Sequence, residues 1–373
     1  KARVVQGLRD LERKYPGKKI LVVSHGDPIM VISDGTLPAV SEMREFSLKN
    51  HPYNRDGELD LHRPYIDEIH LKCEACQGKM VRVKEVVDVW FDSGAMPFAQ
   101  WHYPFENQDL FKQNFPADFI TEAIDQTRGW FYTMLAIATA LGKKVPYKNV
   151  ICYSHVLDAK GKKMSKSIGN VVDPWEVIEK YGADATRWYF YSVNNPGDPK
   201  LFALEDVAKV QRGFLMTLMN CLRFYELYET RSMKHETYSP KPAEPLDDWI
   251  LSRLHNTIHV VTTALDSYDP TLASRTLEYF IVEDLSKWWI RRSRDRFPEA
   301  AELLRYLLIK TSKLLAPFIP FTAEHIYKQV SNRSESVHLE NWPRVEEKYL
   351  KPDLEKNMQR IRELVTLGLA QRK

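Results

Sequence analysis

The sequence predicts an α/β region followed by an all-α region, that is, part of a parallel-sheet domain and then an antiparallel helical bundle. Three observations carry this prediction. Residues 88–198 alternate strand-like and helix-like patterns, as parallel sheets with crossover helices do. Residues 199–373 contain almost no strand signal and several stretches with apolar residues at helical spacing. The length of 373 residues suits two or three domains.

The composition is ordinary for a globular chain and excludes several classes of protein. Hydrophobic residues make up 44% and charged residues 28%, which argues against wholesale disorder. The 53 basic and 50 acidic residues give a net charge of +3, so any nucleic-acid surface must be local. The uncharged run from Gly129 to Gly142 is shorter than the roughly 20 residues of a membrane helix, so we expect no membrane segment.

Four cysteines and no secretory signal peptide favour a reducing, cytoplasmic location. The chain begins at Lys1 rather than Met. We therefore expect it to be a piece of a longer protein.

Residues 1–50 are expected to form a helix, then a strand and then a loop. Pro16 and Gly17 end the helix, and the apolar run Ile20–Val23 predicts a short strand that leads into His25. The helix carries its apolar face on one side, formed by Val4, Val5, Leu8 and Leu11.

Residues 88–198 contain two well-marked strands with a helix between them. The strands are expected at Asp118–Thr121 and Val150–Tyr153. The helix is expected to present one apolar face, formed by Trp130, Met134, Ile137 and Leu141.

The next helix has clear start and stop signals. Asp173 is the expected N-cap, Pro174 takes the first helical position, and Glu176 completes a capping box. Gly182 is the expected stop.

Residues 199–373 are expected to form the helical bundle. The predicted helices follow Val207 to Leu222, Ile250 to Leu265, Leu272 to Trp289, Glu299 to Leu315 and Ala323 to Val330, with Pro317 and Pro320 as breaks and Thr237 to Pro245 as a loop.

The sharpest chemical signal is the run Lys163-Met164-Ser165-Lys166-Ser167 on the loop before the capped helix. Two lysines and two hydroxyls, with Gly161 and Gly169 as hinges, form a mobile cationic loop. Such a loop can close on a polyphosphate and neutralise charge that develops there. The alternative interpretation is a solvated basic turn.

This run resembles the KMSKS signature of class I aminoacyl-tRNA synthetases, and further stretches resemble isoleucyl-tRNA synthetases in particular. The resemblance covers roughly residues 57–373. It implies the second half of a Rossmann-like catalytic domain over residues 88–198 and a helical anticodon-binding domain over residues 199–373. Valyl and leucyl relatives share the lysine run and the helices, and remain alternatives. The stretches are Val87 to Ala99, Trp101 to Asn107, Asp125 to Phe131, Trp289 to Phe297 and Leu315 to Phe321.

The resemblance implies a binding site for the aminoacyl-adenylate after the first strand. Glu122 is expected at the carboxyl end of that strand, where ligands bind in open α/β sheets, and to contact the substrate ammonium. Asp125 and Gln126 are expected to hydrogen-bond the adenylate, with Trp130 beside it. One departure is Ala123, where the family usually has glycine. The alternatives are a solvated carboxylate for Glu122 and a core aromatic ring for Trp130.

The resemblance also assigns the catalytic group. Lys166 is expected to stabilise the transition state in which pyrophosphate leaves ATP, together with Mg²⁺. Lys163 is expected to support loop closure and contact the pyrophosphate. Ser165 and Ser167 complete the ATP-binding loop and are expected to shape it.

Residues 51–87 are polar, connective and turn-rich, and carry Cys73-x-x-Cys76, a spacing found in zinc knuckles. One pair supplies two thiolates, whereas a structural zinc site takes four ligands, so the alternatives are a half-site or free thiols. His62, His70 or a second cysteine pair could complete a site, and Cys152 and Cys221 are expected in the core.

Residues 1–50 resemble the C-terminal part of histidine phosphatases, through the strand that ends at His25. That resemblance implies a remnant of an inserted domain without phosphatase activity, and the alternative is an unrelated strand and loop.

A separate basic and aromatic cluster is the expected tRNA-facing side, with a solvated charged face as the alternative. The cluster consists of Lys287, Trp288, Trp289, Arg291, Arg292, Arg294 and Arg296.

Together these features predict ATP-dependent joining of isoleucine to its tRNA through an isoleucyl-adenylate, by an enzyme expected to be monomeric when intact. No His-x-Gly-His motif, which the family uses to bind ATP, occurs in the sequence. We therefore expect the chain alone to be inactive. The alternatives are a tRNA-binding module without catalysis and a phosphatase that uses His25.

Overall fold

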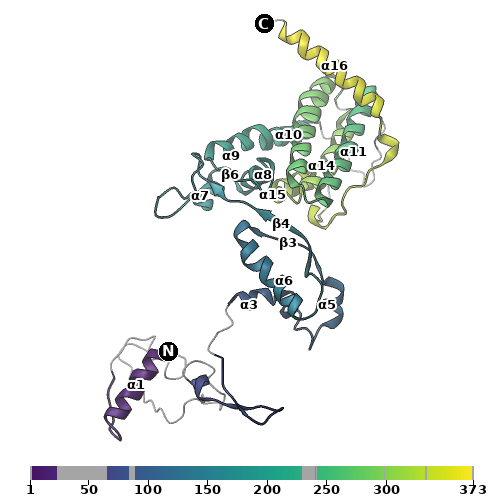
Figure 1. Cartoon of the computed structure of the whole chain (residues 1–373). Helices are drawn as coiled ribbons and strands as arrows, with labels where there is room; N and C mark the ends of the chain where they lie inside the picture. Colours follow the sequence, from purple (N-terminus) through teal and green to yellow (C-terminus); the bar gives the residue numbers. More distant parts are fainter. Residues whose placement is uncertain are drawn as a thin grey trace. The chain divides into compact units, whose positions relative to one another are not determined.

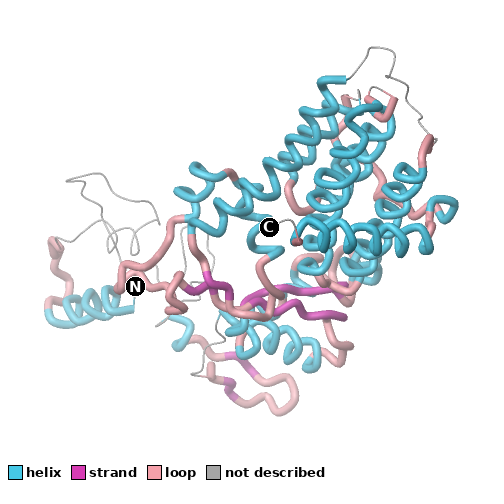
Figure 2. The backbone as a smooth tube through the Cα atoms, turned by 90° about the horizontal axis from the view of Figure 1, so that it is seen from above, coloured by secondary structure: helices cyan, strands magenta, loops and turns pink. Residues whose placement is uncertain are grey.

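The computed structural model describes residues 2–22, 65–83, 89–228, 240, 242–297, 299–331 and 334–371. By its contacts the chain divides into two units, Lys1–Val89 and Trp90–Lys373. Figure 1 traces the elements along the chain, and Figure 2 colours them as helix, strand and loop.

The first unit contains one helix and one small hairpin. Helix α1 spans Ala2–Lys14, and the chain turns after it at Gly17, whose φ is +73°. The strand predicted at residues 20–23 is wrong for the part that is described, because residues 20–22 find no strand to pair with there. Strands β1 (Leu71–Lys72) and β2 (Lys79–Met80) pair antiparallel after the short 3₁₀ helix Tyr65–Glu68. His25 and His62 lie outside the described residues.

The second unit contains a parallel strand pair. Strand β3 (Ala117–Ala123) pairs with β4 (Tyr147–Tyr153), in a register that sets Glu122 opposite Cys152. The predicted strands are thus confirmed, each a little longer than expected. Between them lie the 3₁₀ turn Ile124–Arg128 and helix α6 (Trp130–Ala140).

Helix α6 confirms the predicted apolar face only in part. Its buried residues are Phe131, Met134 and Ala138, whereas Leu141 lies beyond its end and is exposed. Phe131 and Met134 pack with Ile120 of β3, and the predicted Trp130 and Ile137 are half-buried. The prediction is wrong for Leu141, because apolar residues cover most of this helix and periodicity alone could not choose the side that faces the strands. Before β3, the chain forms α3 (Val89–Gly94), α4 (Met96–Ala99) and α5 (Gln108–Asn114).

A second parallel pair follows. Strand β5 (Val156–Leu157) pairs with β6 (Lys200–Leu201), and helices α7 (Pro174–Tyr181) and α8 (Ala183–Ser192) connect them. The predicted cap is confirmed, because Asp173 Oδ1 accepts the Trp175 N–H at 2.9 Å. Gly182 ends α7 with φ +87°.

The rest of the unit is helical, as predicted. Two long helices contain a π-helical stretch, Gln211–Leu215 between α9 and α10 and Phe280–Ile290 after α12. The C-terminal helix α16 extends past its neighbours in Figure 1 and was not predicted. The helices are α9 (Leu204–Val210), α10 (Met216–Tyr228), α11 (Pro245–Asp266), α12 (Pro270–Tyr279), α13 (Arg291–Ser293), α14 (Ala301–Leu315), α15 (Pro320–Ser331) and α16 (Pro352–Ala370).

One large apolar core joins α8 to these helices. Trp188 of α8 is fully buried and stacks on Phe214 with ring centroids 4.1 Å apart. The Arg187 guanidinium donates to the carbonyls of Pro317 and Phe318, both at 2.8 Å. The helical region and the end of the α/β region are therefore packed together, and the boundary predicted at residue 198 stays a prediction. Across the residues described above, no helix combines the length and apolar character that a membrane crossing requires.

Candidate functional site

The carboxyl ends of β3 and β4 bring a carboxylate and a phenol together. Glu122 Oε2 accepts a hydrogen bond from the Tyr153 hydroxyl at 3.0 Å. This bond raises the pKa of Tyr153, so the phenol keeps its proton. Glu122 is only partly exposed, and its other oxygen has no partner among the described residues. The sequence analysis missed Tyr153, because only the strand register shows that it lies beside Glu122.

The turn after β3 uses its own side chains to start α6. Gln126 Oε1 accepts the Trp130 N–H at 2.8 Å, and Gln126 Nε2 donates to Asp125 at 3.1 Å. The Trp130 indole N–H donates to the Ser93 carbonyl at 3.0 Å. Asp125 is exposed, whereas Gln126 and Trp130 are half-buried and hold the turn in place.

Gly129 is required at this turn by its neighbours. A Cβ there would lie 2.6 Å from Gln126 Oε1 and 3.0 Å from the Trp90 ring. Ala123, the departure from the family pattern, has an ordinary φ of −73°, so the alanine introduces no backbone strain.

The lysine loop follows β5 and leads into α7 (Figure 1). Lys163 forms an antiparallel bridge with Leu157, and Met164 packs against the core of α7 and α8. Gly161 and Gly169 have φ of +76° and +72°, in the left-handed region that favours glycine. Ser165 and Ser167 hydrogen-bond each other through their hydroxyls at 2.8 Å.

Both lysine ammonium groups of this loop are available to an anion. Lys163 and Lys166 are exposed, and within the described parts of the chain neither has an ion-pair partner. Many other basic side chains in this unit, such as Lys148, are paired with carboxylates. The loop follows β5, and Glu122 lies at the carboxyl end of β3, so each is at the end of a parallel strand where ligands bind in α/β sheets.

The cysteine pair lies in the hairpin of the first unit. Hydrogen bonds from the backbone of Cys76 and Ala75 lower the pKa of the Cys73 thiol. Amide donors around a thiolate suit one half of a zinc knuckle. In the described ranges, however, no three metal-ligating side chains come together, and His70 does not complete a site.

The basic and aromatic cluster is split between the core and the surface. Arg296 turns inward and pairs with Asp247, which also accepts the Trp289 indole N–H at 2.9 Å. Arg292 stacks on Trp288 at 3.2 Å from the ring centroid. The exposed remainder is Lys287, which pairs with Glu283 at 2.6 Å, and Arg291 and Arg294, which are open to solvent.

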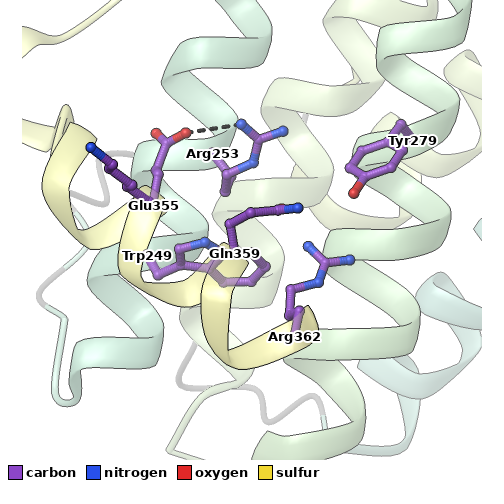
Figure 3. A pocket seen from close by; sticks show the side chains of 7 residues that line it. Trp249, Arg253, Tyr279, Glu355, Gln359 and Arg362 are labelled. Carbon is purple, nitrogen blue, oxygen red and sulfur yellow. Dashed lines mark hydrogen bonds and ion pairs between the residues drawn. The ribbon is translucent and has the colours of Figure 1, made fainter. Parts of the chain in front are cut away.

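A pocket of about 240 Å³ lies beside this cluster, between α11, α12 and α16 (Figure 3). Behind it, buried Asp284 pairs with Arg253 at 2.9 Å and with Arg362. Arg253 also pairs with Glu355 of α16 at 2.9 Å. The exposed Tyr279 ring and the exposed Lys356 suit a stacked base with a nearby phosphate, whereas Trp249 is buried and both arginines are paired with carboxylates. The pocket lining consists of Trp249, Arg253, Tyr279, Glu355, Lys356, Gln359 and Arg362.

Two family models match the chain. The model for class I tRNA synthetases (I, L, M and V) matches residues 27–201, and the model for the anticodon-binding domain of tRNA ligases matches residues 247–373. The first match includes residues 27–50, so the histidine-phosphatase resemblance of residues 1–50 is not supported.

Curated relatives are isoleucine–tRNA ligases. The chain is 47% identical over 345 residues to the isoleucine–tRNA ligase of Bacillus thuringiensis (strain Al Hakam), covering 90% of the chain and 33% of the relative. It is 44% identical over 352 residues to that of Clostridium tetani, with the same shares covered. The chain thus spans about a third of the length of these relatives.

Solved structures share the fold. An Agrobacterium radiobacter leucyl-tRNA synthetase in a ternary complex with tRNA matches 76% of the chain and 36% of its own length, with a TM-score of 0.59 and 21% identity. The Mycobacterium tuberculosis methionyl-tRNA synthetase in complex with methionyl-adenylate matches 69% of the chain and 53% of its own length, with a TM-score of 0.55 and 21% identity.

Proposed function

The chain belongs to the class I aminoacyl-tRNA synthetase family, and from this premise we propose that it supplies the lysine-loop half of the catalytic site and the tRNA-binding helices of an isoleucine–tRNA ligase. The observation that carries the proposal is the pair of unpaired ammonium groups at Lys163 and Lys166, on a loop at the ligand-binding edge of the parallel strands. The two strand pairs would then be part of one Rossmann-like sheet. The high identity to isoleucine–tRNA ligases favours isoleucine over valine or leucine.

In the proposed reaction, an oxygen of the isoleucine carboxylate attacks the α-phosphorus of ATP. The bond between the α-phosphorus and the bridging oxygen breaks, and pyrophosphate leaves. Lys166 stabilises the negative charge that develops on the phosphates, and Lys163 holds the pyrophosphate. Mg²⁺, when bound, would share this neutralisation. A tRNA hydroxyl then attacks the carbonyl of the adenylate and releases AMP.

Glu122 and its neighbours would hold the amino-acid side of the adenylate. The free oxygen of Glu122 suits the isoleucine ammonium, while Tyr153 fixes the carboxylate in place. Asp125 is exposed at the same edge and can accept a hydrogen bond from a ribose hydroxyl. Gln126 and Trp130 would contribute indirectly, because their hydrogen bonds stabilise the turn beside the adenylate.

The test of the catalytic role removes one charge at a time. Lys166→Ala in the intact ligase should lower the rate of isoleucine-dependent ATP–pyrophosphate exchange by at least about 100-fold, with little change in the KM for isoleucine. Lys144→Ala, which removes an equally exposed lysine outside the loop, is the matched control. Equal losses in rate and in isoleucine binding would contradict the assigned role. The 373-residue chain alone should show no exchange, and a clear signal from it would refute the half-site proposal.

The helical region is proposed to bind tRNA through the exposed Arg291 and Arg294 and the pocket of Figure 3. Phosphate contacts make binding weaken steeply with salt. A gel shift of tRNA by the chain should therefore weaken strongly between about 50 and 200 mM salt. A flat salt series would refute direct phosphate contact. The second candidate function is a tRNA-binding module without catalysis. It predicts the same dependence of tRNA binding on salt, but no ATP-dependent role for Lys166.

Cys73 and Cys76 are proposed as two of the four ligands of a structural zinc site. Their residue types and the lowered pKa of Cys73 fit such a site. The other two ligands would come from outside the described residues.

A further inference from the structure

Two side chains at the ends of the lysine loop hydrogen-bond each other. Asn170 Nδ2 donates to Asp158 Oδ2 at 2.9 Å and to the Lys163 carbonyl at 3.2 Å. Asn170 Oδ1 accepts the Ser165 N–H at 2.8 Å. The loop is thus tied across its base and also at its centre.

Asp158 hydrogen-bonds to the backbone of the first half of the loop. Its Oδ1 accepts the N–H groups of Lys160 and Lys162, both at 2.9 Å. The Asp158 N–H donates to the Lys162 carbonyl at 2.8 Å, which closes a tight turn through Gly161. The bond from Asn170 and that from Lys162 lower the pKa of Asp158, so the carboxylate is ionised at neutral pH.

The ties leave the lysine side chains free. Asp158 and Asn170 are half-buried, while Lys163 and Lys166 between them are exposed. Asn170 fixes the backbone on both sides of Met164, which is itself anchored in the core. The backbone positions of the lysines are therefore set before any anion arrives.

We propose that Asp158 and Asn170 form a clamp whose role is to position Lys163 and Lys166 for polyphosphate. Neither residue touches the phosphates, so both are positioning residues. The inference rests on the proposed function of the lysine loop. A loop that is ordered in advance loses less conformational entropy when it binds, which favours both ground-state and transition-state contacts.

The donor and acceptor roles in the clamp can be exchanged. In Asp158→Asn, the amide offers one acceptor oxygen in place of two, so it loses either the bond from Asn170 or those from the Lys160 and Lys162 N–H groups. In Asn170→Asp, two carboxylates face each other and both bonds donated by Asn170 are lost. The double variant Asp158→Asn/Asn170→Asp restores one donor and one acceptor between the two side chains, together with the original net charge, but not the bond to the Lys163 carbonyl.

The probe is tripolyphosphate, and ATP with Mg²⁺ in parallel, titrated into the 373-residue chain by calorimetry. Each single variant should weaken binding by about tenfold, and the double variant should recover part of that loss. The Asp158→Asn result is the most informative. Removing a negative charge beside two lysines should tighten anion binding if charge alone mattered, whereas loss of the clamp should weaken it. Asp109→Asn, an exposed carboxylate outside the loop, is the control.

Hydrogen exchange of the Lys162 and Ser165 amides reports on the clamp without any ligand. Exchange should accelerate in the single variants and slow again in the double variant. If exchange and polyphosphate affinity stay unchanged in the single variants, the clamp is overturned. If exchange accelerates but affinity does not fall, the positioning role is overturned. If the unmodified chain binds neither probe, the failure lies in the proposed phosphate-binding function, and the positioning role falls with it.

Discussion

Asp284 is the buried charge on which the attachment of α16 depends. Its side chain is fully buried in the π-helical stretch after α12, where it pairs with Arg253 of α11 and Arg362 of α16. Arg253 also pairs with Glu355, so a single carboxylate links three elements. Helix α16 itself has no fully buried residue and rests on the core mainly through Leu354 and Met358.

Replacing Asp284 with Asn should therefore destabilise the second unit strongly. Breaking a buried ion pair by removing one partner costs about 3–5 kcal/mol, and we expect the lower end because asparagine keeps one acceptor. About 3 kcal/mol corresponds to a fall in Tm of about 6–12 °C for a domain of roughly this size. The neighbouring Glu283→Gln removes an exposed pair with Lys287 and should cost only about 0.3–0.5 kcal/mol.

Thermal unfolding followed by circular dichroism measures both variants. Hydrogen exchange adds the location, because Asp284→Asn should accelerate exchange in α16 before it affects α14. Equal Tm values for the Asp284 and Glu283 variants would refute the reasoning, as would protection of α16 that does not change. The same variant should weaken tRNA binding, since the walls of the pocket in Figure 3 separate when α16 moves.

Two further predictions follow from buried groups. Burial lowers the pKa of His255 from 6.5 to about 4. Between these pH values the unfolded chain binds a proton that the folded chain does not, so the stability of the fold decreases as the pH is lowered from about 6.5 to 4. In His255→Gln, the decrease in the free energy of unfolding between pH 7 and pH 4 should be smaller by about 3 kcal/mol. Urea unfolding at the two pH values measures this difference. Gly94→Ala would bring a Cβ within 2.8 Å of the Thr133 backbone and should destabilise by about 1–3 kcal/mol in a thermal melt. Gly213→Ala, with open space around it, should be neutral or stabilising, and the reverse order of the two glycine variants would contradict the packing argument.

The sequence predicted the parts of the fold that local chemistry determines. The cap at Asp173 and the stop at Gly182 involve neighbours in the chain, so their residue types were enough. The buried face of α6 depends on which side meets β3 and β4, and a helix with apolar residues on most of its surface does not specify that side. Helix α16 was missed because its contacts with the core are few and its attachment is largely ionic.

Within the candidate site, the residues proposed to meet substrate were easier to identify from the sequence than those proposed to support them. Lys163 and Lys166 were found because the run itself is distinctive. Tyr153 and the clamp partners Asp158 and Asn170 were missed, since their roles depend on a strand register and on a contact across twelve residues. Arg296 was placed on the RNA-facing side, whereas it pairs with Asp247 inside the helical region. A cluster of arginines cannot show by itself which members are satisfied internally.

The state of each charge, paired or unpaired, separates structural cations from the proposed functional ones among the described residues. Arg296 pairs with buried Asp247, and Arg253 and Arg362 share buried Asp284, so removing any of the three takes a partner from a buried carboxylate. Lys163 and Lys166 have no such partner in the described residues, yet the backbone that carries them is held by four side-chain hydrogen bonds from Asp158 and Asn170 to the loop's main chain. An ordered backbone that presents unpaired ammonium groups to solvent gains nothing for stability, because mutual repulsion of the lysines opposes the folded state. The arrangement is consistent with stabilisation by an anion of several charges, and the triphosphate of ATP meets that requirement.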